Sequence, residues 1–173
     1  MNTIFNRVII TEKHSVAIDI SKSLGSVKRD DGFISVGEYA ITWAYGHLAS
    51  FDESEIPRRW RIEDLPIIPK EFNFKIDADK ESHFLVIQNL LDVANEAIIA
   101  TDAGREGEMI ARTILNLSHF RGKIYRFWTS EALSSEVVLK TMANLKEAKE
   151  YDSLYYSALA RHHSDWIMGI NLT

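Results

Sequence analysis

Apolar and polar positions divide the first part of the chain into a strand, a helix and three further short runs. Residues 8–11 form an apolar, β-branched run, which predicts a buried strand ending before Glu12. Apolar residues spaced by four then predict a helix over residues 16–24. Three β-branched and aromatic runs separated by Asp-Gly and Gly-Glu predict an antiparallel meander over residues 26–30, 33–36 and 39–43.

After an irregular connection, the second part repeats the alternation of strands and helices. All three prolines lie between residues 51 and 70, which favours an extended connection there. The pattern then predicts strands over residues 72–76, 97–101 and 124–128. It predicts helices over residues 84–94, 109–117 and 154–170, and a further helix that Ser134 caps and that runs to about Leu145.

This order of elements predicts an α/β fold. Strands that alternate with helices form a mostly parallel sheet with helices on both faces and right-handed crossovers. The meander is an antiparallel insertion in that sheet. From about residue 151 the chain becomes helical, so we predict one domain over residues 1–150 and the start of a second, helical domain over residues 151–173.

Composition and charge narrow the classes of protein. The 173 residues are 46% apolar, enough for a compact core, and no apolar run approaches the length of a membrane span. The first residues lack a secretory signal, so we expect a cytoplasmic protein with no membrane partner. The absence of cysteine excludes disulfides and thiolate zinc sites, and the scattered histidines indicate no transition-metal site. A net charge of −5 predicts weak DNA binding by this chain alone.

Three acids gather where the strand over residues 97–101 meets the following helix. Asp102 follows the strand, and Glu106 and Glu108 follow two glycines, Gly104 and Gly107, that allow a tight turn. Acids at the carboxyl end of a parallel strand suit Mg²⁺ and phosphate. Equally, Glu106 and Glu108 would be ordinary acids of a first helical turn that face solvent. If the strand before Glu12 is a neighbour, Glu12 and Asp102 face one crevice, which favours the metal.

At these residues the chain resembles the Toprim domain, a metal-binding fold shared by topoisomerases, bacterial primases and some nucleases. Its signature is a Glu after the first strand, here Glu12, and an Asp-x-Asp pair after a later one, here beginning at Asp102. Five ordered blocks resemble type IA DNA topoisomerases, nearly all of them the bacterial topoisomerase III branch, and they comprise residues 12–17, 43–48, 60–66, 100–111 and 160–171. The chain departs from the pattern at Gly104, which stands at the second aspartate, and at His14, where these enzymes usually have proline.

The resemblance implies a catalytic site and a cofactor. Type IA enzymes cut one DNA strand with a tyrosine, hold the 5′ phosphate covalently and reseal the strand. On that model Glu12 exchanges a proton with the departing 3′ oxygen, and Lys13 and Arg105 stabilise phosphate charge. Mg²⁺ would be held by Glu12, Asp102 and Glu106, and Gly104 favours one ion over two.

The resemblance also implies single-stranded DNA as a partner. Arg161 and Asp165, four residues apart on one helical face, would line the DNA groove, although a surface ion pair is the alternative. His47 would lie near the DNA path or serve as a structural hydrogen-bonding residue. Arg58, Arg59 and Arg61 beside Trp60 would contact phosphate and stack on a base, or simply solvate a loop.

The tyrosine domain is expected elsewhere in the parent enzyme. None of the six tyrosines of this chain has a matching context, so we expect the chain alone not to cleave or relax DNA. Two other functions stay open. One is a nuclease or primase-like Toprim enzyme that acts alone, and the other is a non-catalytic module that binds Mg²⁺ or nucleic acid. Nucleotide binding is disfavoured because no phosphate-binding glycine loop is present.

Overall fold

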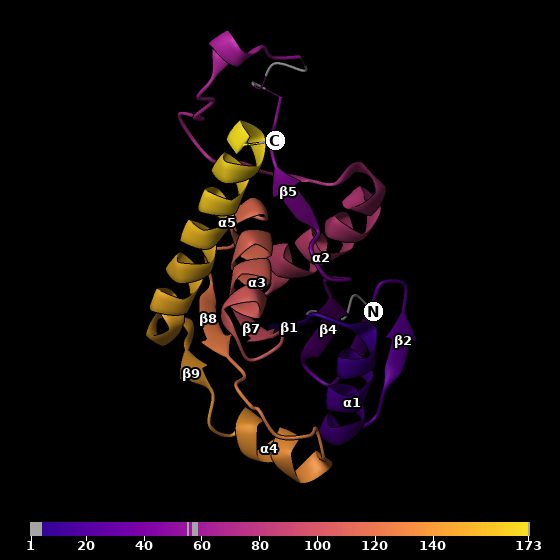
Figure 1. Ribbon diagram of the computed structural model, residues 1–173. Coiled ribbons are helices and arrows are strands. Elements are labelled where there is room, and N and C mark those ends of the chain that lie inside the picture. Colours follow the sequence, from indigo (N-terminus) through magenta and orange to yellow (C-terminus); the bar gives the residue numbers. More distant parts are fainter. Residues whose placement is uncertain (1–4, 55, 57–58, 173) are drawn as a thin grey trace.

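The computed structural model describes residues 5–54, 56 and 59–172, and these residues form a seven-stranded sheet with helices around it. The strand order is β2-β3-β4-β1-β7-β8-β9 (Figure 1). Strands β4, β1, β7 and β8 are mutually parallel, whereas β3 and β9 are antiparallel to their neighbours. The bounds are β1 Arg7–Thr11, β2 Lys28–Asp30, β3 Phe33–Val36, β4 Tyr39–Trp43, β7 Glu96–Ala100, β8 Lys123–Arg126 and β9 Lys146–Glu147.

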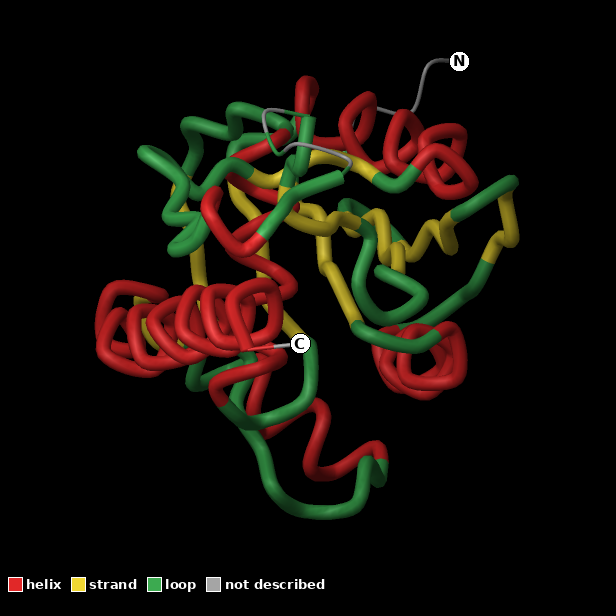
Figure 2. The backbone as a smooth tube through the Cα atoms, turned by 45° about the horizontal axis from the view of Figure 1, so that its top comes forward, coloured by secondary structure: helices red, strands yellow, loops and turns green. Residues whose placement is uncertain are grey.

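Helices cover both faces of this sheet (Figures 1 and 2). In the central strand β1, Val8 and Ile10 pack on one face with apolar residues of α2 (Glu81–Val93) and α3 (Arg105–Leu117). Ile9 points to the other face, where α1 (His14–Leu24) and α4 (Ser135–Met142) supply the core. Because successive residues of a strand point to opposite faces, a continuous apolar run is required here. The expected mostly parallel sheet with two covered faces is confirmed.

Most of the expected elements are present, with one change of partner. The meander over residues 26–43 forms β2, β3 and β4, and Ser134 caps α4 by accepting a hydrogen bond from the backbone N–H of Val137. The strand expected over residues 72–76 is β6 (Phe74–Ile76), and it does not join the parallel sheet. It pairs antiparallel with β5 (Ala49–Phe51) in a separate two-stranded sheet. Neither β5 nor β9 was predicted, since three or two residues are too few to show a period.

The last helix, α5 (Asp152–Leu172), lies along the outer side of α3 (Figure 1). It follows the short turn η3 (Ala148–Tyr151) and contacts the connection between β5 and β6, which includes the turn η1 (Ile62–Asp64). A further short turn, η2 (Ala78–Lys80), lies between β6 and α2. The Asn171 side chain accepts from the N–H of Ile67 at 2.6 Å and donates to its carbonyl oxygen at 2.9 Å. The ring of His163 stacks on Phe72 with centroids 4.0 Å apart. The proposed domain boundary near residue 151 coincides with the start of α5 and stays a prediction.

Across the described residues, no helix combines the length and apolar character that crossing a membrane requires.

Candidate functional site

The carboxyl ends of β1, β4 and β7 meet at one edge of the sheet. Thr11, the last residue of β1, lies opposite Trp43 of β4 on one side and Ala100 of β7 on the other. The turn after β1 carries Glu12, and the turn after β7 carries Asp102, so the two turns leave adjacent strands at the same level. The condition set from the sequence, that these two strands are neighbours, is met.

The ammonium group of Lys13 lies within ion-pair distance of both acids. Its Nζ is 3.3 Å from Asp102 Oδ2 and 4.0 Å from Glu12 Oε1. The Asp102 side chain is 59% exposed and that of Glu12 is 18% exposed, so Glu12 sits deeper in the site. One ammonium group therefore lies within 4.0 Å of an oxygen of each carboxylate. Two carboxylates with water and phosphate are a ligand set that Mg²⁺ commonly takes, so these residues fit the ion. Lys13 must turn aside when a metal binds between them.

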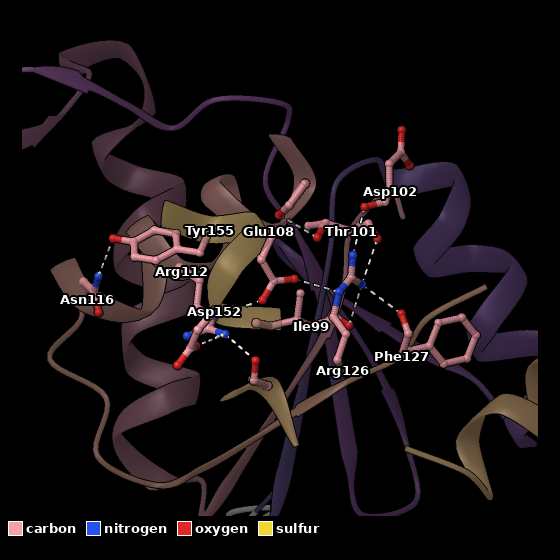
Figure 3. A network of polar contacts seen from close by, with 12 residues as sticks. Ile99, Thr101, Asp102, Glu108, Arg112, Asn116, Arg126, Phe127, Asp152 and Tyr155 are labelled. Carbon is pink, nitrogen blue, oxygen red and sulfur yellow. Dashed lines mark hydrogen bonds and ion pairs between the residues drawn. The ribbon is translucent and has the colours of Figure 1, made fainter. Parts of the chain in front are cut away.

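A buried arginine holds the turn that carries Asp102 (Figure 3). Arg126, the last residue of β8, is almost completely buried. Its guanidinium donates four hydrogen bonds of 2.8–3.0 Å to the backbone carbonyl oxygens of Ile99, Thr101, Asp102 and Phe127. Burial lowers the pKa of Arg126 from its usual value, and Glu108 opposes that shift. The position of Asp102 therefore depends on a charged group below the surface of the site.

Glu108 points into the interior, toward this arginine. Its carboxylate is fully buried, with Oε2 2.8 Å from Arg126 Nε and Oε1 3.0 Å from Arg112 Nε. The contact with Arg126 is a close ion pair that is not aligned as a hydrogen bond. Arg112 also pairs with Asp152 at 2.9 Å and donates to the carbonyl oxygen of Ala148. Both sequence-based interpretations of Glu108, as part of the metal cluster or as a solvated acid, are wrong.

The buried pair was missed from sequence, although one signal was available. Arg126 interrupts the apolar strand predicted over residues 124–128, and a charge within a buried strand requires a partner. Glu108, in the neighbouring helix, was an acid to which no cationic partner had been assigned.

The two glycines of the acidic turn have different roles. A Cβ atom on Gly107 would overlap the backbone of Asp102, so only glycine lets α3 approach this turn. Thr101 Oγ1 donates to the Gly107 carbonyl oxygen at 2.7 Å and ties the two segments together. Gly104 has extended backbone angles, and a Cβ atom there would meet nothing within 4 Å. Its lack of a side chain is therefore not required by packing.

Glu106 lies beside two histidines. The ligand atoms of His47, Glu106 and His162 are all within 4.8 Å of one another, and no other three His, Asp or Glu side chains in the described part of the chain converge in this way. The structure thus does not bring Glu106 into one such group with Glu12 and Asp102. Glu106 Oε2 is 3.8 Å from His162 Nε2, whereas Arg105 Nε faces Oε1 at 3.9 Å.

The residues expected to bind DNA occupy the exposed surface. Arg161 and Asp165 form an ion pair of 3.4 Å, with side chains 54% and 67% exposed. This is the surface ion pair that the sequence allowed as the alternative to a role in the DNA groove. His47 and Arg59 are exposed, and Trp60 beside Arg59 is 41% exposed. Arg58 lies outside the described residues.

A cavity of about 290 Å³ adjoins the acidic turn. It lies at the ends of β7 and β8, and its lining includes Ala100, Asp102, Phe127 and Thr129. Of the residues described above for the metal site, Asp102 lines this cavity, whereas Glu12 and Lys13 do not.

Comparisons with known proteins show which family the chain resembles in sequence. The Toprim domain matches residues 7–132. DNA topoisomerase 3 of Staphylococcus haemolyticus (strain JCSC1435) is 38% identical over 172 residues, and DNA topoisomerase 3 of Bacillus anthracis is 39% identical over 173 residues. Each comparison covers 96% of this chain but 24% of the relative, so the chain spans about a quarter of the length of these proteins.

Proposed function

The chain belongs to the Toprim family, and from that premise we propose that it is the amino-terminal, Mg²⁺-binding part of a type IA DNA topoisomerase of the topoisomerase III kind. The observation that carries the proposal is the convergence of Glu12 and Asp102 on Lys13 at adjacent strand ends. Relatives named DNA topoisomerase 3 support the choice of parent enzyme. The intact enzyme would cut and reseal single-stranded DNA, and thereby relax or decatenate DNA in the cytoplasm.

Glu12 and Asp102 are the proposed metal ligands. Glu106 is the third, and its carboxylate has to turn away from His162 to reach them. When bound, Mg²⁺ would orient the 3′ end of the cut strand and neutralise phosphate charge. With no second aspartate at position 104, a single ion suits this ligand set.

The remaining roles follow from exposure and charge. Glu12 is sheltered from water, so it suits a group that gives a proton to the departing 3′ oxygen and takes it back on resealing. Lys13 and Arg105, with side chains 60% and 45% exposed, are free to turn toward phosphate oxygens. The tyrosine nucleophile of the proposed parent enzyme would lie outside this chain.

The DNA groove would run over the exposed residues near α5. Arg161 and Asp165 are held in a weak surface pair, which costs little to open. His47 and Arg59 lie on the connections that flank β5.

Metal binding tests the site directly. Isothermal titration of Mg²⁺ into the chain should show one site that Asp102→Asn and Glu12→Gln weaken, and Asp165→Asn serves as the control that leaves it unchanged. Binding that both site variants leave intact would contradict the proposed ligands.

A chimaera tests the parent enzyme. The matching region of the Bacillus anthracis relative is replaced by this chain, and relaxation of negatively supercoiled plasmid is measured. We expect relaxation that Glu12→Gln abolishes. The chain by itself should show no relaxation. Metal-dependent cutting of single-stranded DNA by the chain alone would instead favour the Toprim nuclease.

A further inference from the structure

We propose that His47, Glu106 and His162 form a binding site for a transition-metal ion of the Zn²⁺ class, which shares only Glu106 with the Mg²⁺ site proposed at Glu12 and Asp102. The three side chains come from three distant parts of the sequence. His47 follows β4, Glu106 lies in the first turn of α3, and His162 lies in the middle of α5. Only the folded chain brings these groups together.

The ligand atoms are close to coordination distance from a common point. All lie within 4.8 Å of one another, and the His162 Nε2 to Glu106 Oε2 distance is 3.8 Å. Zn–N and Zn–O bonds of about 2.0–2.2 Å in a tetrahedron require ligand atoms about 3.3 Å apart. Each side chain thus needs a shift of about an ångström, which partly exposed side chains make by small rotations. The two imidazole rings already face one space, with centroids 5.8 Å apart.

These ligand groups have no strong competing partners. Within the described residues, no hydrogen bond of 3.5 Å or less involves the side chains of His47, Glu106 or His162. Among the residues that the structure describes, two cations lie nearby: Arg105 Nε is 3.9 Å from the other carboxylate oxygen of Glu106, and Lys80 Nζ donates to the backbone carbonyl oxygen of His47 at 2.6 Å. Exposed pairs of this kind contribute about 0–1 kcal/mol, so a metal would displace little.

The ligand chemistry separates this site from the Mg²⁺ site. Neutral imidazole binds Zn²⁺, Co²⁺ and Ni²⁺, whereas Mg²⁺ prefers oxygen ligands. Two histidines and one carboxylate leave at least one coordination position open. A bound ion would join the connection after β4, the start of α3 and α5, and so brace α5 against the sheet domain.

Co²⁺ is the probe, because its visible absorption reports the number and geometry of its ligands. Titration of the wild-type chain should give a saturable visible band at one equivalent, and Zn²⁺ should abolish it by displacement. His47→Ala, His162→Ala and Glu106→Gln should each weaken binding roughly tenfold or more, since even supporting residues around a metal cost 10–100-fold. Zn²⁺ should also raise the melting temperature of the wild type more than that of these variants.

Two control variants make the test specific. His119→Asn removes an exposed histidine whose φ of 55° asparagine tolerates, and it should leave Co²⁺ binding unchanged. Asp102→Asn should weaken Mg²⁺ binding and leave Co²⁺ binding unchanged, whereas Glu106→Gln, which removes the shared ligand, should weaken both. The proposal is overturned if Co²⁺ does not bind, if binding survives loss of both His47 and His162, or if His119→Asn weakens it as much.

Discussion

Replacing Arg126 with methionine removes a buried charged group that supports the Asp102 turn from inside the protein. The wild-type guanidinium donates to four backbone carbonyl oxygens and pairs with Glu108 at 2.8 Å. Methionine replaces the apolar stem of arginine and carries neither the guanidinium nor its charge. The carbonyl group of Thr101 would lose this donor, the carbonyl group of Ile99 would keep the N–H of Phe127, and Glu108 would keep only Arg112.

Two contributions set the expected loss of stability. Removing one partner of a buried ion pair costs about 3–5 kcal/mol, because the other charge stays buried. A buried acceptor without its donor costs about 1–3 kcal/mol. The contributions overlap, since one guanidinium serves all these partners and Arg112 still neutralises Glu108. We therefore expect the free energy of unfolding to fall by about 3–5 kcal/mol, a large part of the roughly 5–15 kcal/mol typical of a domain.

Equilibrium unfolding in urea, followed by tryptophan fluorescence, measures this loss. Arg161→Met is the matched control, because it breaks an ion pair that is more than half exposed and should change stability by less than about 0.5 kcal/mol. If Arg126→Met does not fold, the same unfolding measurement is made on Arg126→Lys. This variant keeps the positive charge but removes the forked guanidinium that reaches four carbonyl groups.

A double variant separates charge from packing. Arg126→Met combined with Glu108→Met replaces the pair by apolar groups and should recover part of the loss, because no buried acid is left short of a partner. A loss below about 1 kcal/mol in Arg126→Met would refute the reasoning, since the buried pair and its hydrogen bonds would then contribute little.

Three further changes have defined outcomes. Gly104→Asp has room for its side chain and should strengthen Mg²⁺ binding in titration calorimetry. Gly104→Asn, which adds no charge, should not strengthen it. Equal Mg²⁺ affinities of the two variants would contradict the idea that glycine at position 104 removes a carboxylate ligand. Gly107→Ala should lower stability by about 1–3 kcal/mol in urea unfolding through overlap with the Asp102 backbone, and an unchanged midpoint would exclude that close approach. Hydrogen bonds from Ser50 and then Lys80 hold the pKa of Asp77 below its usual value, so its contribution is present above the unfolded carboxyl pKa and is lost as pH falls through the folded one. Melting temperatures of the wild type and Asp77→Asn should therefore converge only below about pH 4, and a difference that persists to pH 2 would contradict this assignment.

Local patterns in the sequence predicted most of the fold. The runs at residues 8–11 and 97–101 are apolar at successive positions, which only a strand buried on both faces requires. The short strands β5 and β9 escaped prediction because they carry too little pattern. The run at residues 72–76 was assigned correctly as a strand, but it pairs with β5 in a separate two-stranded sheet. A periodic pattern does not specify which strand is the partner.

The sequence by itself determined that Glu12 and Asp102 end apolar strands, and hence that they face one edge of a parallel sheet. Tertiary structure decided in which direction each of the nearby acids, Glu106 and Glu108, points. Glu108 turns inward to Arg126, while Glu106 turns outward to His47 and His162. Two residues apart on a helix, side chains point about 200° apart, so they meet different surroundings. The residues that each side chain contacts belong to elements far away in the chain, and no local sequence pattern specifies those contacts.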